Sequence, residues 1–325
     1  MLVELMAYPL SVVCRVLDVT QSGFHAWRAR MPSLRDHARD RLRSDIHKVF
    51  EAHRGRYGAP RLYRVLREQH GYTGSLNRIQ ALMRAMGLRA KAGRKFKVTT
   101  DSAHSLPIAP NLLSQDFSCD SSAESTSHAK APDQVWLSDI TYLWTREGWL
   151  YVCAVLDLYT RKIVGWAIAG HMTRELVLEA LRMAWATRKP APGLIFHSDR
   201  GSQYACHEVR DWLAAQAMRQ SMSGTGNCYD NAPMESFWHS LKVEETHGQD
   251  FATRAEARHS VFSYIEGWYN TTRMHSSLGY QSPIQFERAC NAKLSKAAND
   301  DLSTSDLSTV SSDNSQSARL TKRAA

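Results

Sequence analysis

The hydrophobic positions of residues 134–245 change between strand-like and helix-like spacing. Three stretches rich in Val, Ile, Trp and Tyr (VWLSDITYLW, WLYVCAVLDLYT and KIVGWAIAG) follow one another closely and predict an antiparallel meander. TRELVLEALRMAWATR then has one apolar face at helical spacing, and GLIF after it is typical of a buried strand. Two further helices flank the short strand RQSMS, which gives the order β-β-β-α-β-α-β-α. Because a helical crossover favours parallel pairing, we predict an α/β unit with a mixed sheet.

The first 98 residues show helical spacing only. LSVVCRVLDVTQSGFHAWRAR breaks at DVTQSG and predicts two short helices joined by a tight turn. GAPRLYRVLREQH and LNRIQALMRAMG predict a second pair, with a serine cap before its second helix and Gly87 after it. This is the helix-turn-helix plan, although helical hairpins also serve purely structural roles. The side chains that the last helix would offer to a DNA groove are Asn77, Arg78, Gln80 and Arg84.

Two other stretches lack this periodicity. Residues 99–131 are rich in Ser, Ala and Pro and predict a linker, in which only NLL and Phe117 are able to dock on a neighbouring surface. Residues 291–325 have almost no aromatic or branched apolar content and predict a disordered tail. The expected organisation is a helical DNA-binding region over 1–98, the linker, an α/β domain with a helical extension over 132–290, and the tail.

Charge divides the chain of 325 residues in a similar way. Residues 1–110 hold 20 Lys and Arg against 8 Asp and Glu, whereas the remaining residues hold 21 against 24. Cationic side chains release counterions from phosphates, so the basic helical region suits a polyanion such as DNA. A solvated helical surface would show the same excess.

The cysteine spacing and the hydropathy of the chain indicate which cellular compartment to expect. Six cysteines lack any C-x-x-C pair, which argues against a disulfide framework and a thiolate zinc site. No apolar run reaches the length of a membrane span, and the start lacks the basic region of a signal peptide. We therefore expect a soluble cytoplasmic protein.

The predicted strand order places two aspartates close together. That order is the ribonuclease-H-like arrangement, in which the crossover strand lies parallel beside the first strand. Asp139 in WLSDIT and Asp199 after GLIFHS then become neighbours at one sheet edge. Two carboxylates this close need a shared proton or a cation, and a hard divalent cation with oxygen ligands is the natural solution.

A third acid lies on the last helix of this unit. Met234, Phe237 and Leu241 predict its buried stripe, while the adjacent face carries Glu235, His239 and Lys242. The two aspartates and Glu235 could hold two Mg²⁺ or Mn²⁺ ions, which would activate an attacking oxygen and stabilise a leaving oxygen in phosphoryl transfer. Lys242 would then bind a DNA phosphate. No zinc is expected.

Several blocks carry a resemblance to a known family. WLSDITYLW, LDLYTRKIVGW, HSDRGSQY, SMSGTGNCYDNAPMESFWHSLKVE and YIEGWYNTTRMHSSLGYQSP resemble the integrase-type catalytic domain of insertion-sequence transposases of the IS-three family. The 35 residues between Asp199 and Glu235 match its D,D(35)E pattern, and the resemblance spans residues 5–290. It implies a ribonuclease-H-like core, two-metal catalysis, and transposition by DNA cleavage and strand transfer. It also places Asp139, Asp199 and Glu235 on the catalytic triad.

The resemblance implies partners as well. The family acts on double-stranded DNA, at transposon ends and target, and we expect a homo-oligomer on that DNA. The chain resembles the product of a second reading frame (OrfB), so the product of the upstream frame (OrfA) is expected as a fusion or a partner. The stretch before Pro132 is longer than the family's usual link.

Neighbouring residues predict supporting roles. His197 would form hydrogen bonds at the strand end, or contact metal or DNA. Asn231 and its neighbours Asn227, Tyr229 and Asp230 would cap and position the helix of Glu235. A further family block could serve packing or DNA contact equally well, and it contains Tyr269, Asn270, Arg273 and His275.

Two other functions are compatible with parts of the sequence. HSDR followed by Tyr229 fits a tyrosine recombinase, but that reading leaves Asp139 and Glu235 unexplained. A DNA-binding regulator with an inactive integrase-like fold is the second alternative. The intact triad together with Lys242 argues against it.

Overall fold

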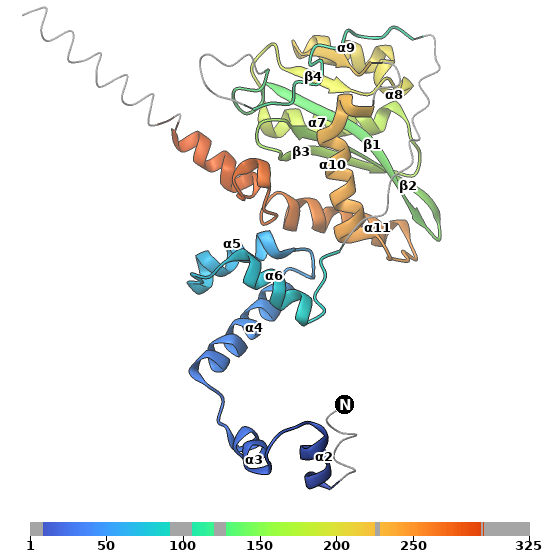
Figure 1. Cartoon of the computed structure of the whole chain (residues 1–325). Helices are drawn as coiled ribbons and strands as arrows, with labels where there is room; N and C mark the ends of the chain where they lie inside the picture. Colours follow the sequence, from blue (N-terminus) through green and yellow to red (C-terminus); the bar gives the residue numbers. More distant parts are fainter. Residues whose placement is uncertain (1–8, 92–105, 120–127, 225–227, 294, 296–325) are drawn as a thin grey trace, which may run out of the picture. The chain divides into compact units, whose positions relative to one another are not determined.

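The computed structural model describes residues 9–91, 106–119, 128–224, 228–293 and 295 (Figure 1). The chain forms two compact units, Met1–Ala90 and Lys91–Ala325. The first is helical and the second contains one mixed sheet, so the predicted fold class is confirmed. In the part of the chain that is described, no helix is long and apolar enough to cross a membrane.

The helical unit contains five described helices. α2 (Leu10–Val16) packs on α3 (Gln21–Ala29), while α4 (Leu34–Ala52), α5 (Ala59–His70) and α6 (Leu76–Ala85) pack on one another. The pairs α2–α3 and α5–α6 are the predicted hairpins. Ser75 caps α6 as expected, because its hydroxyl accepts a hydrogen bond of 3.3 Å from the Arg78 amide. The buried side chains of this second group include Leu42, Ile46, Leu62, Leu66, Ile79 and Met83.

The second unit contains a five-stranded sheet in the order β3-β2-β1-β4-β5. β1 (Val135–Thr145), β2 (Gly148–Asp157) and β3 (Ile163–Ala169) form the predicted antiparallel meander. β4 (Ile195–Ser198) lies parallel to β1, and β5 (Arg219–Met222) lies parallel to β4. The crossover between β3 and β4 runs through α7 (Arg174–Arg188), as the helical pattern predicted.

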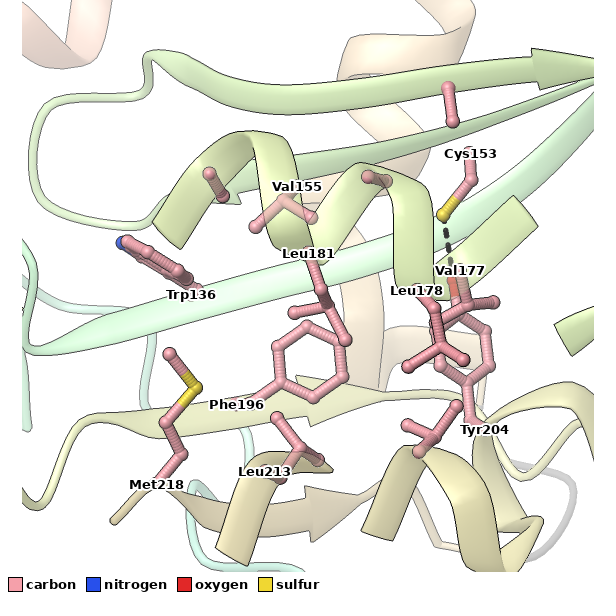
Figure 2. Packing of buried hydrophobic residues seen from close by; sticks show 14 of the residues in the cluster. Trp136, Cys153, Val155, Val177, Leu178, Leu181, Phe196, Tyr204, Leu213 and Met218 are labelled. Carbon is pink, nitrogen blue, oxygen red and sulfur yellow. Dashed lines mark hydrogen bonds between the residues drawn. The ribbon is translucent and has the colours of Figure 1, made fainter. Parts of the chain in front are cut away.

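One face of this sheet packs against α7 and two shorter helices, α8 (Ser202–Ala205) and α9 (His207–Ala215). Figure 2 shows the core, in which Leu181 of α7 and Tyr204 of α8 meet Phe196 of β4. Helix and sheet approach closely at Gly165, where an added β-carbon would lie 2.3 Å from the carbonyl oxygen of Ala180. The absence of a side chain at this position therefore sets how closely α7 approaches β3.

Another group of helices contacts β1 and β2. α10 (Ala232–Leu241) is followed by a π turn (Lys242–Thr246), and α11 (Arg254–Tyr264) by a second π turn (Ile265–Tyr269). Asn270 then closes the sheet edge at Ile163, whose amide and carbonyl both bond the Asn270 side chain at 2.9 Å. Residues 283–293 are helical, so the helix continues past residue 290, while residues 296–325 of the expected tail lie outside the described residues.

A buried ion pair joins Glu244 of the first π turn to Arg273, which follows the second. The Arg273 guanidinium donates to both carboxylate oxygens of Glu244, at 2.9 and 3.0 Å, and to Ser240 of α10 at 2.8 Å. Glu244 also accepts hydrogen bonds from Tyr264 and Trp268. Burial alone would raise the pKa of Glu244, but the charge of Arg273 and these hydrogen bonds hold it below its ordinary value.

Part of the predicted linker docks on this unit. Leu113 of the NLL stretch is buried, and the Leu112 amide donates to the Ser221 hydroxyl at 2.9 Å. Asn111 donates to Asp230 at 3.0 Å, just before α10. NLL is one of the two places where the sequence predicted docking. Residues 99–105 and 120–127 lie outside the described residues.

We predict that Arg273→Met destabilises the protein by about 3–5 kcal/mol, because it leaves the Glu244 carboxylate buried without a counter-charge. Urea unfolding followed by circular dichroism measures this. The matched control is Arg146→Met, since Arg146 forms its ion pair with Asp250 in solvent. Equal unfolding midpoints for the two variants would show that the buried ion pair contributes no more to stability than the exposed one.

Candidate active site

The parallel register of β1 and β4 brings two acids together. Leu137 of β1 pairs with His197 of β4, so two residues further along each chain Asp139 lies beside Asp199. Burial and the negative charge of Asp199 both raise the pKa of Asp139. The structure therefore places these two carboxyl groups at one sheet edge, as the sequence predicted.

Asp139 is held in place by two hydrogen bonds. One carboxylate oxygen accepts from the Ile140 amide at 2.8 Å, and the other accepts from the indole Nε1 of Trp238 at 3.1 Å. Both bonds favour the charged form of Asp139 and oppose the effect of burial. Trp238 lies on α10, so this contact joins the helix of Glu235 directly to the strand of Asp139.

Sequence reasoning missed Trp238. The sequence predicted a buried stripe of Met234, Phe237 and Leu241 on α10, and all three are buried. Trp238, which was not included, is also buried, with only 4% of its surface exposed. The signal was present, because Trp238 lies four residues after Met234 and three before Leu241.

Asp199 is fixed by the turn that follows β4. Its carboxylate accepts a hydrogen bond of 2.9 Å from the Gly201 amide. A β-carbon at Gly201 would lie 3.0 Å from the same oxygen. The glycine in HSDRGSQY thus lets a backbone amide approach the carboxylate closely.

Glu235 is on the exposed side of α10. Burial raises its pKa, and its charge adds to the groups that raise the pKa of Asp139. Among the described residues, no three His, Cys, Asp or Glu side chains converge into a compact metal-binding group. The structure brings Asp139 and Asp199 together, and the Glu235 carboxylate is near enough for its charge to act on Asp139.

The chemistry of these side chains fits a hard divalent cation. Carboxylate oxygens are the ligands that Mg²⁺ and Mn²⁺ prefer, whereas zinc sites use mainly Cys and His. Burial and then the charge of Asp199 raise the pKa of Asp139, and a bound cation would relieve the repulsion between the two carboxylates. Asp139, Asp199 and Glu235 are the residues able to hold one.

Lys242 lies on the same side of α10 as Asp139. Its ammonium is 5.5 Å from the ring centroid of Tyr142. Burial lowers the pKa of Lys242, and the charge of Asp139 partly opposes that effect. The α-helix ends at Leu241, so Lys242 begins the π turn instead of completing a second α-helical turn after Glu235. His239, which the sequence put on this face, is exposed.

His197 is completely buried beside the two acids. Its Nδ1 bonds the Ser221 hydroxyl at 2.8 Å, and its Nε2 bonds the Asp230 carbonyl at 2.9 Å. Burial lowers the pKa of His197 to about 4, so it is neutral near pH 7. Because both ring nitrogens are engaged, the histidine that a recombinase would need is not available to a phosphate.

Asn231 does not have the expected capping contact. It occupies the N-cap position of α10, but its side chain makes no cap hydrogen bond. Instead its amide donates to the Ser138 carbonyl at 3.1 Å, because the strand lies within reach. Asp230 likewise bonds Asn111 and Gly224, so both residues hold the loop before α10 in place. Asn227 and the side chain of Tyr229 lie outside the described residues.

In the block that the sequence left open between packing and DNA contact, Tyr269, Asn270 and Arg273 are buried and His275 is half-buried. Asn270 and Arg273 are buried in the contacts described above. Tyr269 packs edge-on against Phe237 of α10, with ring centroids 4.8 Å apart, and His275 packs on Tyr269 in turn. Tyr269 and Arg273 therefore hold α10 in place through Phe237 and Ser240.

In the helical unit, the four side chains expected to meet DNA are all exposed on α6: Asn77, Arg78, Gln80 and Arg84. Gln80 and Arg84 also line a cavity of about 410 Å³ formed with the start of α5 and residues 87–90. The surface is therefore polar, accessible and partly basic.

Comparisons with known families match most of the chain. Residues 37–96 match an HTH-like domain, and residues 129–228 and 235–289 match two integrase core domain families. Transposase InsF for insertion sequence IS3A of Escherichia coli K12 is 44% identical over 282 residues, which cover 86% of this chain and 94% of that protein. A protein of insertion element IS600 from Shigella sonnei is 43% identical over 274 residues, covering 84% and 97%.

One chain in a solved structure of the simian T-cell lymphotropic virus intasome is similar to this protein, and the match covers 74% of each of the two chains. Its sequence identity is 13% and its TM-score is 0.42, a likeness too slight to bear on the site.

We predict that Trp238→Phe weakens binding of Mn²⁺ about 10- to 100-fold, because it removes the N–H that orients Asp139 while keeping an aromatic ring. Isothermal titration calorimetry measures the affinity. Trp166→Phe is the control, since the Trp166 indole donates to Glu266 and not to the acids. An unchanged affinity in Trp238→Phe would contradict the orienting role.

Proposed function

The chain belongs to the IS3 family of insertion-sequence transposases, and from this premise we propose that Asp139, Asp199 and Glu235 form its catalytic triad. As a transposase with an integrase core, it is a polynucleotidyl transferase. The observation that carries the proposed triad is the register of β1 and β4, which sets Asp139 beside Asp199. Trp238 then joins that pair to the helix carrying Glu235.

The reaction consists of two phosphoryl transfers. Water attacks a phosphodiester at the element's end, and the bond to the 3′ oxygen breaks to free a 3′-hydroxyl. That hydroxyl then attacks a phosphodiester of the target DNA, displacing another 3′ oxygen. Neither step passes through a covalent bond to the protein, so Tyr229 needs no nucleophilic role.

The three carboxylates would hold Mg²⁺ or Mn²⁺. Two ions are expected, because the attacking oxygen must be activated and the leaving oxygen must be stabilised. When bound, such cations supply the positive charge that phosphoryl transfer requires. The chain's own contribution is positional. Trp238 and the Ile140 amide orient Asp139, and the Gly201 amide orients Asp199. Lys242 binds a phosphate of the DNA end, and His197 and Asn231 hold the loop that leads into α10.

DNA recognition belongs to the helical unit in this proposal. The exposed face of α6, with Asn77, Arg78, Gln80 and Arg84, contacts base edges and phosphates. The working assembly is an oligomer on DNA, and the product of an upstream reading frame takes part as a fusion or a partner. Adding that product to cleavage assays tests its contribution.

We predict that Asp139→Asn, Asp199→Asn and Glu235→Gln each abolish cleavage and joining of the element's own ends while sparing DNA binding, since each keeps the shape and removes a charged ligand. Cleavage and joining are followed on labelled oligonucleotides, and binding by gel shift. The matched control is Glu266→Gln, an acid of the same unit that bonds Trp166. Retained joining in any one of the three variants would show that its residue is outside the triad.

We also predict that Lys242→Met weakens binding of the DNA end and lowers joining, because one phosphate contact is lost. The plot of log affinity against log salt should become shallower by about one unit. The comparison variant is Lys189→Met, whose exposed lysine follows α7. Identical salt slopes for the two variants would leave Lys242 as an ordinary solvated lysine.

A further inference from the structure

Three aromatic side chains line the β1–β2 hairpin beyond Asp139. Trp144 pairs with Trp149 across the two strands, and Tyr142 lies two residues before Trp144, so all three side chains share one face. We call Tyr142, Trp144 and Trp149 the aromatic strip. Trp144 is 58% exposed and Trp149 is 43% exposed, which is unusual for such large apolar groups.

The two tryptophan rings of the strip keep much of their surface open. Trp144 and Trp149 have centroids 4.9 Å apart at an interplanar angle of 74°, and Tyr142 meets Trp149 at 5.0 Å and 85°. In edge-to-face contacts of this kind the edge of one ring covers only part of one face of the other ring. The strip therefore offers flat π surfaces to a planar partner.

The inner end of the strip carries a positive charge. The Lys242 ammonium lies over the Tyr142 ring, and it is close enough to Asp139 for that carboxylate to affect its pKa. A cation beside exposed aromatic rings is the combination that binds single-stranded nucleic acid, because the cation meets the backbone and the rings stack on bases.

We propose that the aromatic strip stacks the unpaired bases of the DNA end next to the phosphate being cleaved. The proposal rests on the proposed function, because it takes the scissile phosphate to lie at Asp139. Tyr142 and Trp144 follow Asp139 by three and five residues, about 10 and 17 Å along β1, and because side chains alternate they project from the opposite face of the strand to Asp139. β4 pairs with β1 only at residues 135–137, so β4 does not cover the edge of β1 beyond Asp139, and a DNA end can pass there from one face to the other. At about 3.4 Å per stacked nucleotide, the distance along β1 alone corresponds to at least about three to five nucleotides from the cleaved bond.

A second copy of the chain is a poorer occupant of this surface. A large aromatic side chain buries at most about 250 Å², so two half-exposed tryptophans offer about 250 Å² together. A stable protein interface needs about 800 Å² from each partner. Stacked bases need only the ring faces that are already open.

The test compares two labelled duplexes that carry the same sequence, one fully paired and one with about five unpaired nucleotides at its end. Binding to the full-length chain is measured by fluorescence anisotropy without divalent cations, so that no cleavage occurs. We expect the native chain to prefer the open end. Trp144→Ala combined with Trp149→Ala should lose about tenfold in affinity for it, or about 1.4 kcal/mol, and keep its affinity for the paired duplex.

Two further variants isolate stacking. Trp144→Phe combined with Trp149→Phe keeps flat rings and should keep most of the preference for the open end. Phe262→Ala removes an exposed aromatic ring of α11 and should change neither affinity. Thermal unfolding midpoints that match the native chain show that the variants are folded.

Several results would overturn the proposal. The first is that the double alanine variant loses the same affinity for both duplexes, and the second is that it loses affinity for neither. The third is that the double phenylalanine variant binds the open end as weakly as the double alanine variant. A changed elution volume on size exclusion with an unchanged DNA preference would assign the strip to a protein contact instead. The triad variants are judged by cleavage and the strip by metal-free binding, so failure of one proposal is distinguishable from failure of the other.

Discussion

The repulsion between Asp139 and Asp199 is the constraint on which this site depends. Two neighbouring parallel strands deliver one carboxylate each, and the packed sheet does not allow them to move apart freely. Hydrogen bonds from the Gly201 amide and the Trp238 indole limit how far each carboxylate can turn away. The fold thus keeps a concentration of negative charge that a phosphate cannot approach without compensating cations, which is why Lys242 nearby matters to the proposed reaction.

Most of the structure around the site supports α10. Asn231 joins its first residue to β1, Trp238 joins its middle to Asp139, and Ser240 near its end accepts from Arg273. His197 secures the preceding loop through the Asp230 carbonyl. These hydrogen bonds are buried or partly buried, where a missing bond costs more than it does in water. The helix that carries Glu235 is therefore fixed near its start, in its middle and near its end, and of the groups that hold it only Asp139 belongs to the proposed triad.

The sequence predicted the parts of the structure that follow from periodicity. Strand order, the α7 crossover and the proximity of Asp139 to Asp199 all came from runs of apolar residues and the rule that crossovers pair strands in parallel. α4 was missed because its apolar positions, Leu42, Ile46 and Val49, are embedded in a strongly charged segment. Asn231 occupies the expected N-cap position of α10 but lacks the expected cap hydrogen bond, since propensity identifies a residue suited to cap and cannot reveal a strand carbonyl within reach. Trp238 shows the same limit, because spacing can bury a side chain but cannot choose its hydrogen-bond partner. The roles of the triad and of the DNA-contacting residues remain predictions.

The two π turns limit how this family of chains can vary in length. Each turn closes with an i to i+5 hydrogen bond, from His247 to Lys242 and from Asn270 to Ile265, and so contains one residue more than an α-helical turn. Removing that residue would rotate everything beyond it by about 100°. Glu244 would then turn away from Arg273, and Asn270 away from the edge of β3. This half of the unit should therefore tolerate substitution much better than single-residue insertion or deletion, and related chains should keep a constant number of residues between Glu235 and Arg273.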